Sequence, residues 1–394
     1  MATEDIQERI ERAFASLADA PAAPGGAESD HLSAGRAYLR AMAEDGWAVP
    51  TWPKRFGGRD ADKSESAAIR AAMRGMPVPD LYPFFVGLRM IGPTLLAHGT
   101  PEQQERWLPR IATGDDVWCQ MFSEPEAGSD LANVAMRAVQ DGRSWSLNGQ
   151  KIWTSRGAYA RWAICLARTD PSVPKHAGLT MFVVDMTAPG VDVRPLVQMN
   201  GDDHFSEVFV DDVVVDDADR IGEVGDGWKL ALAVLGFERS SIGELTGGGG
   251  RGERGRLPTW LRELHGLGAL ADPVMRDRAM RAYTQSQINR WTSARAAASA
   301  RSGRRAGPEG SGHKLRTSAF AKQRAYLIKS AFGAQGMLTE HYGHDDFLTA
   351  PSQSIRGGTD EIQRNIVGER VLGLPADART DKDVPWTKSR LGHT

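Results

Sequence analysis

Glu238 occupies the position in this sequence that best suits proton-transfer chemistry. It lies in the segment WKLALAVLGFERSSIG, with Val234 and Leu235 before it and Ile242 after it. Residues three and four apart share one face of an α-helix, so this spacing predicts a carboxylate on an apolar face. Two interpretations stay open: a rim carboxylate paired with a distant base, or a partly buried carboxylate whose raised pKa suits it to abstract a proton. The next residue, Arg239, points about 100° away around the helix and is not expected to be a simple salt-bridge partner of Glu238.

A second candidate is the tandem glycine in the segment IRGGTDEIQR. Gly357 and Gly358 relax the backbone just before Thr359, which two acidic residues follow. A threonine cap and acidic residues in the first turn are typical of a helix start. The segment is therefore either a plain turn into the last helix or an anion site at a helix N-terminus.

Two further segments carry groups that suit a large planar cofactor with a phosphate. In MFSEPEAGSD, Gly128 and Ser129 can offer donors to a phosphate, and Ser123 can offer a hydroxyl to a ring edge. Such a loop is more often only structural. In KIWTSRG, Trp153 offers a flat face with hydroxyls beside it, although a tryptophan in a strand ordinarily packs in the core.

The elements that must position these groups follow an α–β–α order. The N-terminal part has a helical period, and Pro101 opens one of its helices. From about Gln120, short alternating or apolar runs predict strands, and Asn148-Gly149 between two of them predicts a hairpin turn. The apolar residues at helical spacing near the N-terminus are Ile6, Ile10, Phe14 and Leu17, and the later strand-length runs are WAICLA, LTMFVVDM, VDVRPLV and EVFVDDVVV.

After Gly227 the helical period returns. Long helical stretches are predicted near 273–300 and 313–332, with a last helix from about Thr359 to Val371. The run GGGGRGERGR interrupts this part and predicts a flexible loop tip, since no strand precedes it and no Gly-Lys-Ser/Thr follows. The predicted fold is α+β with three domains, namely an N-terminal α-helical domain (1–119), a middle β barrel (120–222) and a C-terminal domain like a four-helix bundle (223–394).

The composition excludes several classes of function. With 394 residues, a net charge of −2 and 25% charged residues, the chain has no electrostatic basis for binding nucleic acid or an anionic membrane. Cys119 and Cys165 are the two cysteines, so no disulfide framework is expected, and no Cys/His cluster has the spacing of metal ligands. The acidic N-terminus and the lack of a long apolar run indicate a cytoplasmic protein without a secretory signal or membrane span.

Taken together, these motifs resemble the acyl-CoA dehydrogenase flavoprotein family. The resemblance rests on FSEPEAGSD, KIWTSRG and GGTDEIQR in that order, on WPKRFGG in the N-terminal part, and on the α–β–α order. It covers nearly the whole chain. It implies FAD as cofactor, an acyl-CoA substrate and an electron-transfer flavoprotein as acceptor. It also implies a homodimer or homotetramer, or a hetero-oligomer of the kind that paired bacterial homologues form.

The resemblance also implies which residues hold the cofactor. The two serines of the β region would hydrogen-bond the isoalloxazine, and the tryptophan would pack on it. The glycine and serine of the first loop would lie near the pyrophosphate, and the threonine and glutamate of the last motif would touch the adenosine half. The full set of expected cofactor residues is Gln120, Phe122, Ser123, Gly128, Ser129, Trp153, Ser155, Gly358, Thr359 and Glu361.

The expected catalytic base follows from a departure within the same motif. The family removes a proton from the α-carbon of the thioester while a hydride leaves the β-carbon, and its usual base is the glutamate of a Glu-Gly-Thr motif. Gly357 stands at that position here. A minority, including isovaleryl- and long-chain-type enzymes, carries the base on the helix after the barrel in an L-x-x-E-R context, which Leu235–Arg239 matches. Glu238 is thus the expected base, Gly357 would polarise the thioester through its N–H, and Arg239 is assigned to substrate binding.

Two further departures concern the FAD site at the subunit interface. The Arg-x-x-Phe-Gly motif, which in many members reaches a neighbouring subunit's FAD, has no match in HGLGALADPVMRDRAM, and Ser330 stands where a glutamine is common. A non-catalytic partner subunit is therefore one alternative function. A flavin monooxygenase on the same fold is another, although such an enzyme needs no α-proton base.

Overall fold

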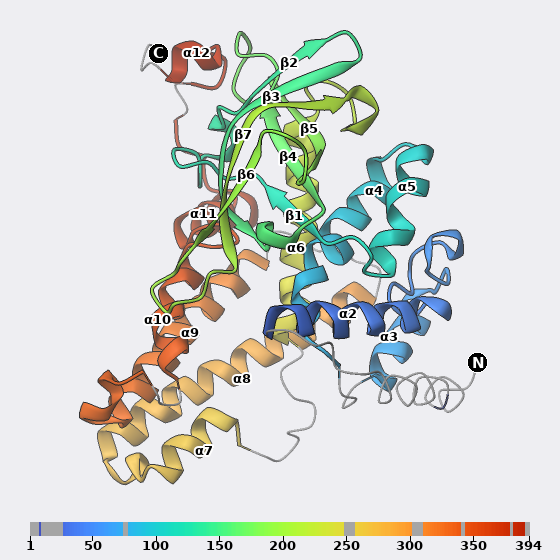
Figure 1. Ribbon diagram of the computed structural model, residues 1–394. Helices are drawn as coiled ribbons and strands as arrows, with labels where there is room; N and C mark the ends of the chain where they lie inside the picture. Colours follow the sequence, from blue (N-terminus) through green and yellow to red (C-terminus); the bar gives the residue numbers. More distant parts are fainter. Residues whose placement is uncertain are drawn as a thin grey trace. The chain divides into compact units, whose positions relative to one another are not determined.

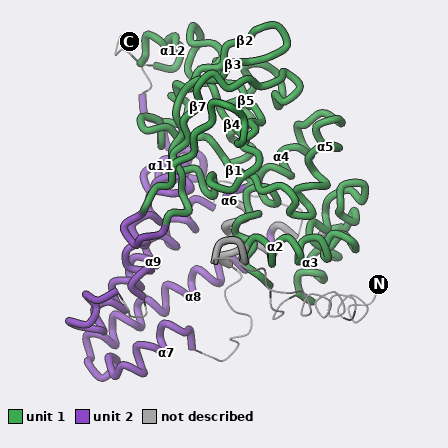
Figure 2. The backbone as a smooth tube through the Cα atoms, in the orientation of Figure 1, with its two compact units in different colours: residues 1–197, 203–237, 379–394 green, residues 198–202, 238–378 purple. Residues whose placement is uncertain are grey.

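The computed structural model describes residues 8, 27–73, 78–247, 257–301, 310–339, 343–378 and 381–390. The chain divides into two compact units (Figure 2), which are described separately below. Unit 1 contains residues 1–197, 203–237 and 379–394, and unit 2 contains residues 198–202 and 238–378. Apart from residue 8, the predicted first helix around Ile6–Leu17 lies outside the described residues, as does most of the tetraglycine segment.

Unit 1 begins with helices whose ends are set by local capping. Asp62 accepts hydrogen bonds from the backbone N–H groups of Ser64 and Glu65 at the start of α3. Thr100 and Gln103 form a reciprocal capping box ahead of α5, with Pro101 at the first helical position, so the predicted start of this helix is confirmed. The helices of this part are α2 (Ala27–Glu44), α3 (Lys63–Ala72), α4 (Gly92–His98) and α5 (Pro101–Ala112).

The strands of unit 1 form one eight-stranded sheet (Figure 1) in the order β6-β7-β3-β2-β4-β5-β8, with β1 parallel to β4. Strands β4 and β5 are buried along nearly their whole length, as their continuous apolar runs require. The helical–sheet–helical class predicted from the sequence is confirmed. The strands are β1 (Trp118–Met121), β2 (Arg137–Asp141), β3 (Ser144–Ser155), β4 (Trp162–Arg168), β5 (Leu179–Asp185), β6 (Val191–Leu196), β7 (Phe205–Asp216) and β8 (Arg220–Ile221).

The predicted hairpin turn at Asn148-Gly149 is wrong. These residues lie inside β3, where the pairing with β7 shifts register between Leu147 and Gly149. A Cβ on Gly149 would lie 2.9 Å from the Cα of Met136, so the glycine is needed for a close backbone approach at an irregularity in the strand. The hairpin turn lies one strand earlier, after Asp141, where Gly142 has a φ of +58°.

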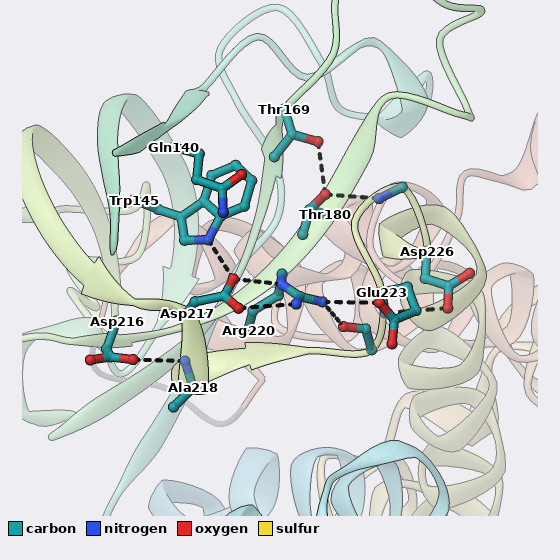
Figure 3. Close-up of polar contacts among 12 residues, drawn as sticks. Gln140, Trp145, Thr169, Thr180, Asp216, Asp217, Ala218, Arg220, Glu223 and Asp226 are labelled. Carbon is teal, nitrogen blue, oxygen red and sulfur yellow. Dashed lines mark hydrogen bonds and ion pairs between the residues drawn. The ribbon is translucent and has the colours of Figure 1, made fainter. Parts of the chain in front are cut away.

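The helix that carries Glu238 is α6 (Gly227–Gly247), and polar contacts fix its start to the sheet (Figure 3). The Asp217 carboxylate accepts from Trp145 Nε1 at 2.7 Å and from Arg220 Nε at 2.9 Å. These hydrogen bonds, with Arg220 the largest cause, hold the pKa of Asp217 below its ordinary value. Gly225 N donates to Thr180 Oγ1 of β5 at 3.0 Å. The segment that leads into α6 is therefore bonded to β5 through Gly225 and to β3 through Asp217.

Unit 2 is helical. Thr359 caps α11 by accepting from Ile362 N at 3.2 Å, which confirms the predicted helix start. α8 and α9 pack side by side (Figure 1) and confirm the two long predicted helices. Trp260, Leu264 and Ile328 lie in its apolar core. The helices are α7 (Thr259–Gly266), α8 (Pro273–Arg301), α9 (Gly310–Ala331), α10 (His344–Thr349) and α11 (Asp360–Ile366), followed by a π turn (Val367–Val371).

Candidate functional site

In unit 1, hydrogen bonds join the loop after β1 to the end of β3. The backbone N–H of Ile152 donates to Ser123 O at 2.9 Å, and Lys151 Nζ donates to Phe122 O at 3.0 Å. The FSEPEAGSD and KIWTSRG motifs, some thirty residues apart, are therefore adjacent. Ser123 is half-buried and lies next to the strand segment that carries Trp153.

A buried ion pair holds this loop from inside. Glu124 accepts from Ala135 N at 2.6 Å, from Met136 N at 2.9 Å and from Lys151 Nζ at 2.8 Å. Lys151 is fully buried and also donates to Leu166 O at 2.7 Å. Both charges are hydrogen-bonded, as buried charges must be. The sequence analysis missed this pair, although Lys151 stands at the alternate strand position that Trp145 and Leu147 also occupy, which is a signal for a buried partner.

The end of β3 presents an aromatic side chain at the surface. Trp153 has a φ of +60° and is 56% exposed, so the interpretation as a core tryptophan is wrong. Its ring meets Phe205 edge-on, with centroids 5.7 Å apart. Thr154 and Ser206 face each other across β3 and β7, and their buried hydroxyls have no hydrogen-bond partner among the described residues. Thr154 and Ser206 are 0% and 1% exposed, so their hydroxyls lie in the interior and not on the surface that carries the indole.

The other predicted cofactor residues of unit 1 differ in how far they are buried. Gln120 lies in β1 and is half-buried, whereas Phe122 is buried. Gly128 and Ser129 are exposed, and a Cβ on Gly128 would meet no atom within 4 Å. Ser155 ends β3, opposite Phe205, and is half-buried. The open space above the loop and the exposed indole suit a planar cofactor with an attached phosphate.

In unit 2, Glu238 and Gly357 face each other although more than a hundred residues separate them. A Cβ placed on Gly357 would have Glu238 Oε1 as its nearest atom, at 4.0 Å. Glu238 is half-buried on α6. Gly357 has a φ of +64°, which side-chain-bearing residues rarely adopt. The carboxylate of Glu238 therefore lies against the space that a side chain at position 357 would enter.

Gly358 is required by close packing as well as by its backbone angle. Its φ is +83°, and a Cβ would lie 2.6 Å from Gln363 Nε2. That amide donates to Gly357 O at 3.0 Å. Any side chain at 358 would therefore displace the group that orients the Gly357 peptide.

Gly358→Ala should lower the free energy of unfolding by more than the left-handed backbone alone requires. The matched control is Gly373→Ala, because Gly373 has a φ of +68° and a Cβ there would meet nothing within 4 Å. The control is expected to lose about 1–2 kcal/mol in urea unfolding, the usual cost of a left-handed residue. Equal losses in the two variants would contradict the role given to Gln363.

The residue after the cap, Asp360, is held by two lysines of α9. Lys314 Nζ lies 3.0 Å from Asp360 Oδ1, and Lys322 Nζ lies 3.8 Å from Oδ2. Burial pushes the pKa of Asp360 upward, but hydrogen bonds from Ser354 and Lys314 outweigh it and hold the pKa below its ordinary value. The ion pair thus fastens the glycine turn to α9.

Asp360→Asn should destabilise the protein near neutral pH but much less in acid. Since the folded pKa is depressed, this stabilisation is complete above the unfolded pKa of about 4 and is lost as the pH falls through the folded pKa. We expect a loss of about 1 kcal/mol at pH 7, given solvent screening of the pair. Urea titrations at several pH values measure it, with Asp277→Asn, a 61% exposed side chain in α8, as control. A difference that stays constant down to pH 3 would rule out the ion pair as its cause.

The remaining predicted positions are less informative. Glu361 is 75% exposed and pairs with Arg364 at 3.1 Å on the same helix. The side chain of Arg239 lies outside what the structure describes. Within the described ranges, no group of three or more His, Cys, Asp or Glu residues can hold a metal ion, and no helix is long and apolar enough to cross a membrane.

Comparison with known proteins assigns each part of the chain to one family. Residues 4–115, 119–213 and 225–372 match the family models for the N-terminal, middle and C-terminal domains of acyl-CoA dehydrogenases. The chain is 37% identical to acyl-CoA dehydrogenase IpdE1 of Mycobacterium tuberculosis, over 90% of this chain and 91% of that protein. It is 40% identical to acyl-CoA dehydrogenase FadE34 of the same organism, over 85% of this chain and 46% of that protein.

Similar solved structures support the same family assignment. The structure titled Tcur3481-Tcur3483 steroid ACAD has a TM-score of 0.74 at 25% identity, covering 96% of this chain and all (100%) of that chain. The ChsE4-ChsE5 complex from Mycobacterium tuberculosis has a TM-score of 0.69 at 27% identity, covering 95% of this chain and 97% of that chain. The chain therefore belongs to the acyl-CoA dehydrogenase family, whose members are flavoprotein oxidoreductases.

Proposed function

We propose that this chain dehydrogenates an acyl-CoA thioester between its α- and β-carbons, with Glu238 as the base and FAD as cofactor. The observation that carries the proposal is the 4.0 Å distance between Glu238 Oε1 and the Cβ position of Gly357. Position 357 corresponds to the glutamate of the usual family motif. A carboxylate supplied from α6 thus lies close to the place that the usual base would enter.

The residues of unit 1 fit FAD. Trp153 would pack on the isoalloxazine, Ser123 and Ser155 would hydrogen-bond it, and Gly128 and Ser129 would approach the pyrophosphate. The exposed indole of Trp153 and the open space at Gly128 support this assignment. In unit 2, Thr359 and Glu361 are assigned to the adenosine half by resemblance, and Gly358 is assigned to cofactor binding. When bound, FAD supplies the acceptor for the hydride that leaves the β-carbon.

Proton removal is the task of the protein itself. The α-proton passes to the Glu238 carboxylate as the double bond forms, and negative charge develops on the thioester oxygen. A backbone N–H at Gly357 would donate to that oxygen, an arrangement that lowers the barrier because the donor is already in place. Glycine at 357 suits this role, since it leaves Glu238 room and adopts a φ of +64° without strain.

We also propose classes of substrate, an oligomeric state and an electron acceptor for this chain. Because one similar structure is titled a steroid ACAD, polycyclic acyl-CoAs belong in the substrate panel beside straight and branched ones. Another is a complex of two different proteins, so a hetero-oligomer is proposed as the alternative to a homodimer or homotetramer. An electron-transfer flavoprotein is the proposed acceptor.

Anaerobic spectroscopy tests the proposed function. The purified protein should carry a flavin spectrum that bleaches when the matching acyl-CoA is added, with formation of the enoyl-CoA. Absence of bound flavin, together with failure to bind added FAD, would favour the non-catalytic partner subunit. Flavin that is reduced only by a nicotinamide nucleotide and then reacts with oxygen to hydroxylate a substrate would favour the monooxygenase.

A further inference from the structure

The C-terminal residues 381–390, here called the C-terminal strap, belong to unit 1 and contact the loop that follows β1. Its helix, α12 (Trp386–Arg390), lies beside the strands of that unit (Figure 1). The backbone N–H of Trp386 donates to Val173 O at 2.9 Å, and that of Thr387 donates to Pro171 O at 3.2 Å. Nothing in the proposed chemistry requires these residues.

Trp386 anchors the strap. It is 9% exposed, and its Nε1 donates to Asn133 Oδ1 at 2.7 Å. Its ring covers the guanidinium of Arg168, whose Cζ lies 4.2 Å from the ring centroid. Arg168 is 3% exposed and donates to Ala132 O at 2.7 Å and to Val134 O at 3.0 Å. One side chain of the strap therefore contacts both Asn133 and the arginine that holds the residues on either side of it.

Two ion pairs connect the strap and its surroundings to the FSEPEAGSD segment itself. Lys175 Nζ bridges Asp130 at 3.0 Å and Asp381 of the strap at 2.8 Å. Arg390 pairs with Glu126 at 2.9 Å. Lys175 is 14% exposed, whereas Glu126 is 81% exposed, so the first contact is partly sheltered and the second lies in solvent.

The loop is thus held from two sides. Glu124 and Lys151 fix it from inside, while Trp386, Arg390 and Asp381 hold it from outside. Between these anchors, Gly128 and Ser129 are exposed, with open space where a side chain on Gly128 would point. A glycine-containing loop held in one conformation binds a ligand without having to be ordered at that moment, which favours affinity.

We propose that the C-terminal strap is a positioning segment that preorganises residues 123–133 to bind FAD. The inference rests on the proposed function, because it takes this loop to be part of the FAD site. Trp386 makes the main contact with the loop, and the Arg390–Glu126 ion pair restrains the exposed part of the loop. The strap residues touch no reacting atom and act through the loop.

Exchanging the charges of Arg390 and Glu126 tests the role of the strap while the packing of Trp386 stays intact. Arg390→Glu faces Glu126 with a like charge and should weaken FAD binding several-fold, whereas Arg390→Glu with Glu126→Arg should restore it. Trp386→Ala should weaken FAD binding about tenfold, since it removes both the ring over Arg168 and the bond to Asn133. Arg40→Glu, which breaks a surface ion pair with Asp115, is the control and should leave FAD binding unchanged.

The readouts are the dissociation constant of FAD, from titration of the flavin-free protein, and hydrogen exchange of residues 123–133. Faster exchange of this loop, weaker FAD binding and rescue by the charge exchange are expected together. A lower melting temperature with unchanged FAD binding and loop exchange would overturn the proposal, because the strap would then be only structural. If the unaltered protein binds no FAD, the proposed function fails instead. Should Trp386→Ala not fold, the charge-exchange variants still decide.

Discussion

Glu238→Gln is expected to lower kcat for acyl-CoA dehydrogenation by about 10²–10⁴-fold, the contribution usual for a positioned base. Glutamine has nearly the same shape but cannot accept the α-proton. Because the substitution keeps the shape of the side chain and Glu238 is not among the residues assigned to FAD, flavin content should be unchanged. Steady-state assays with an artificial electron acceptor measure the effect, with the FAD content of each preparation determined from its spectrum.

Glu223→Gln provides the matched control for this substitution. Its carboxylate is 88% exposed, and its nearest ion-pair partner, Arg220, is 3.8 Å away. The same chemical change there should leave kcat within about twofold, as surface changes ordinarily do. Comparable rates for Glu238→Gln and the unaltered protein would show that another group removes the proton.

Lys151→Met is expected to lower the free energy of unfolding by about 3–5 kcal/mol, the cost of breaking a buried ion pair. The substitution leaves Glu124 without its cationic partner and removes the donor to the carbonyl oxygens of Phe122 and Leu166. Methionine is apolar and of similar length, so loss of charge and hydrogen bonds outweighs loss of volume. Urea unfolding followed by circular dichroism measures the effect.

Two companion variants interpret that result. Lys151→Met combined with Glu124→Gln should lose less stability than the sum of the single substitutions, because no uncompensated charge then remains buried. Lys229→Met is the control, since its side chain is 69% exposed and its ion pair with Asp226 spans 3.9 Å. Strict additivity of the two buried substitutions would argue that the pair has no energetic coupling.

Local sequence patterns predicted much of the candidate site because they act over a few residues. The spacing of Val234, Leu235 and Ile242 around Glu238 predicted a carboxylate on an apolar helix face, and the side chain is half-buried. The Gly-Gly-Thr order predicted the cap at Thr359. The pairing of Glu238 with Gly357 was expected only from family resemblance, because no local period relates residues so far apart.

The features that the sequence did not reveal depend on contacts between distant segments. Asn148-Gly149 has the composition of a hairpin turn, but pairing of β3 with β7 along its length overrides this preference. The Glu124–Lys151 pair and the C-terminal strap join residues far apart in the chain. The strand pattern left both a core position and a cofactor contact open for Trp153, because it cannot show which face of the sheet is left open.

Exchange of the α-proton in deuterated water tests the central claim most directly. The probe is a 3-thia acyl-CoA, which has an α-proton but no β-hydrogen, so only removal and return of the α-proton can occur. Holoprotein with Glu238 should introduce deuterium at the α-carbon, seen by mass spectrometry, and the Glu238→Gln holoprotein should do so at least about 100-fold more slowly. Equal exchange rates for the two proteins would contradict the assignment of Glu238 as the base.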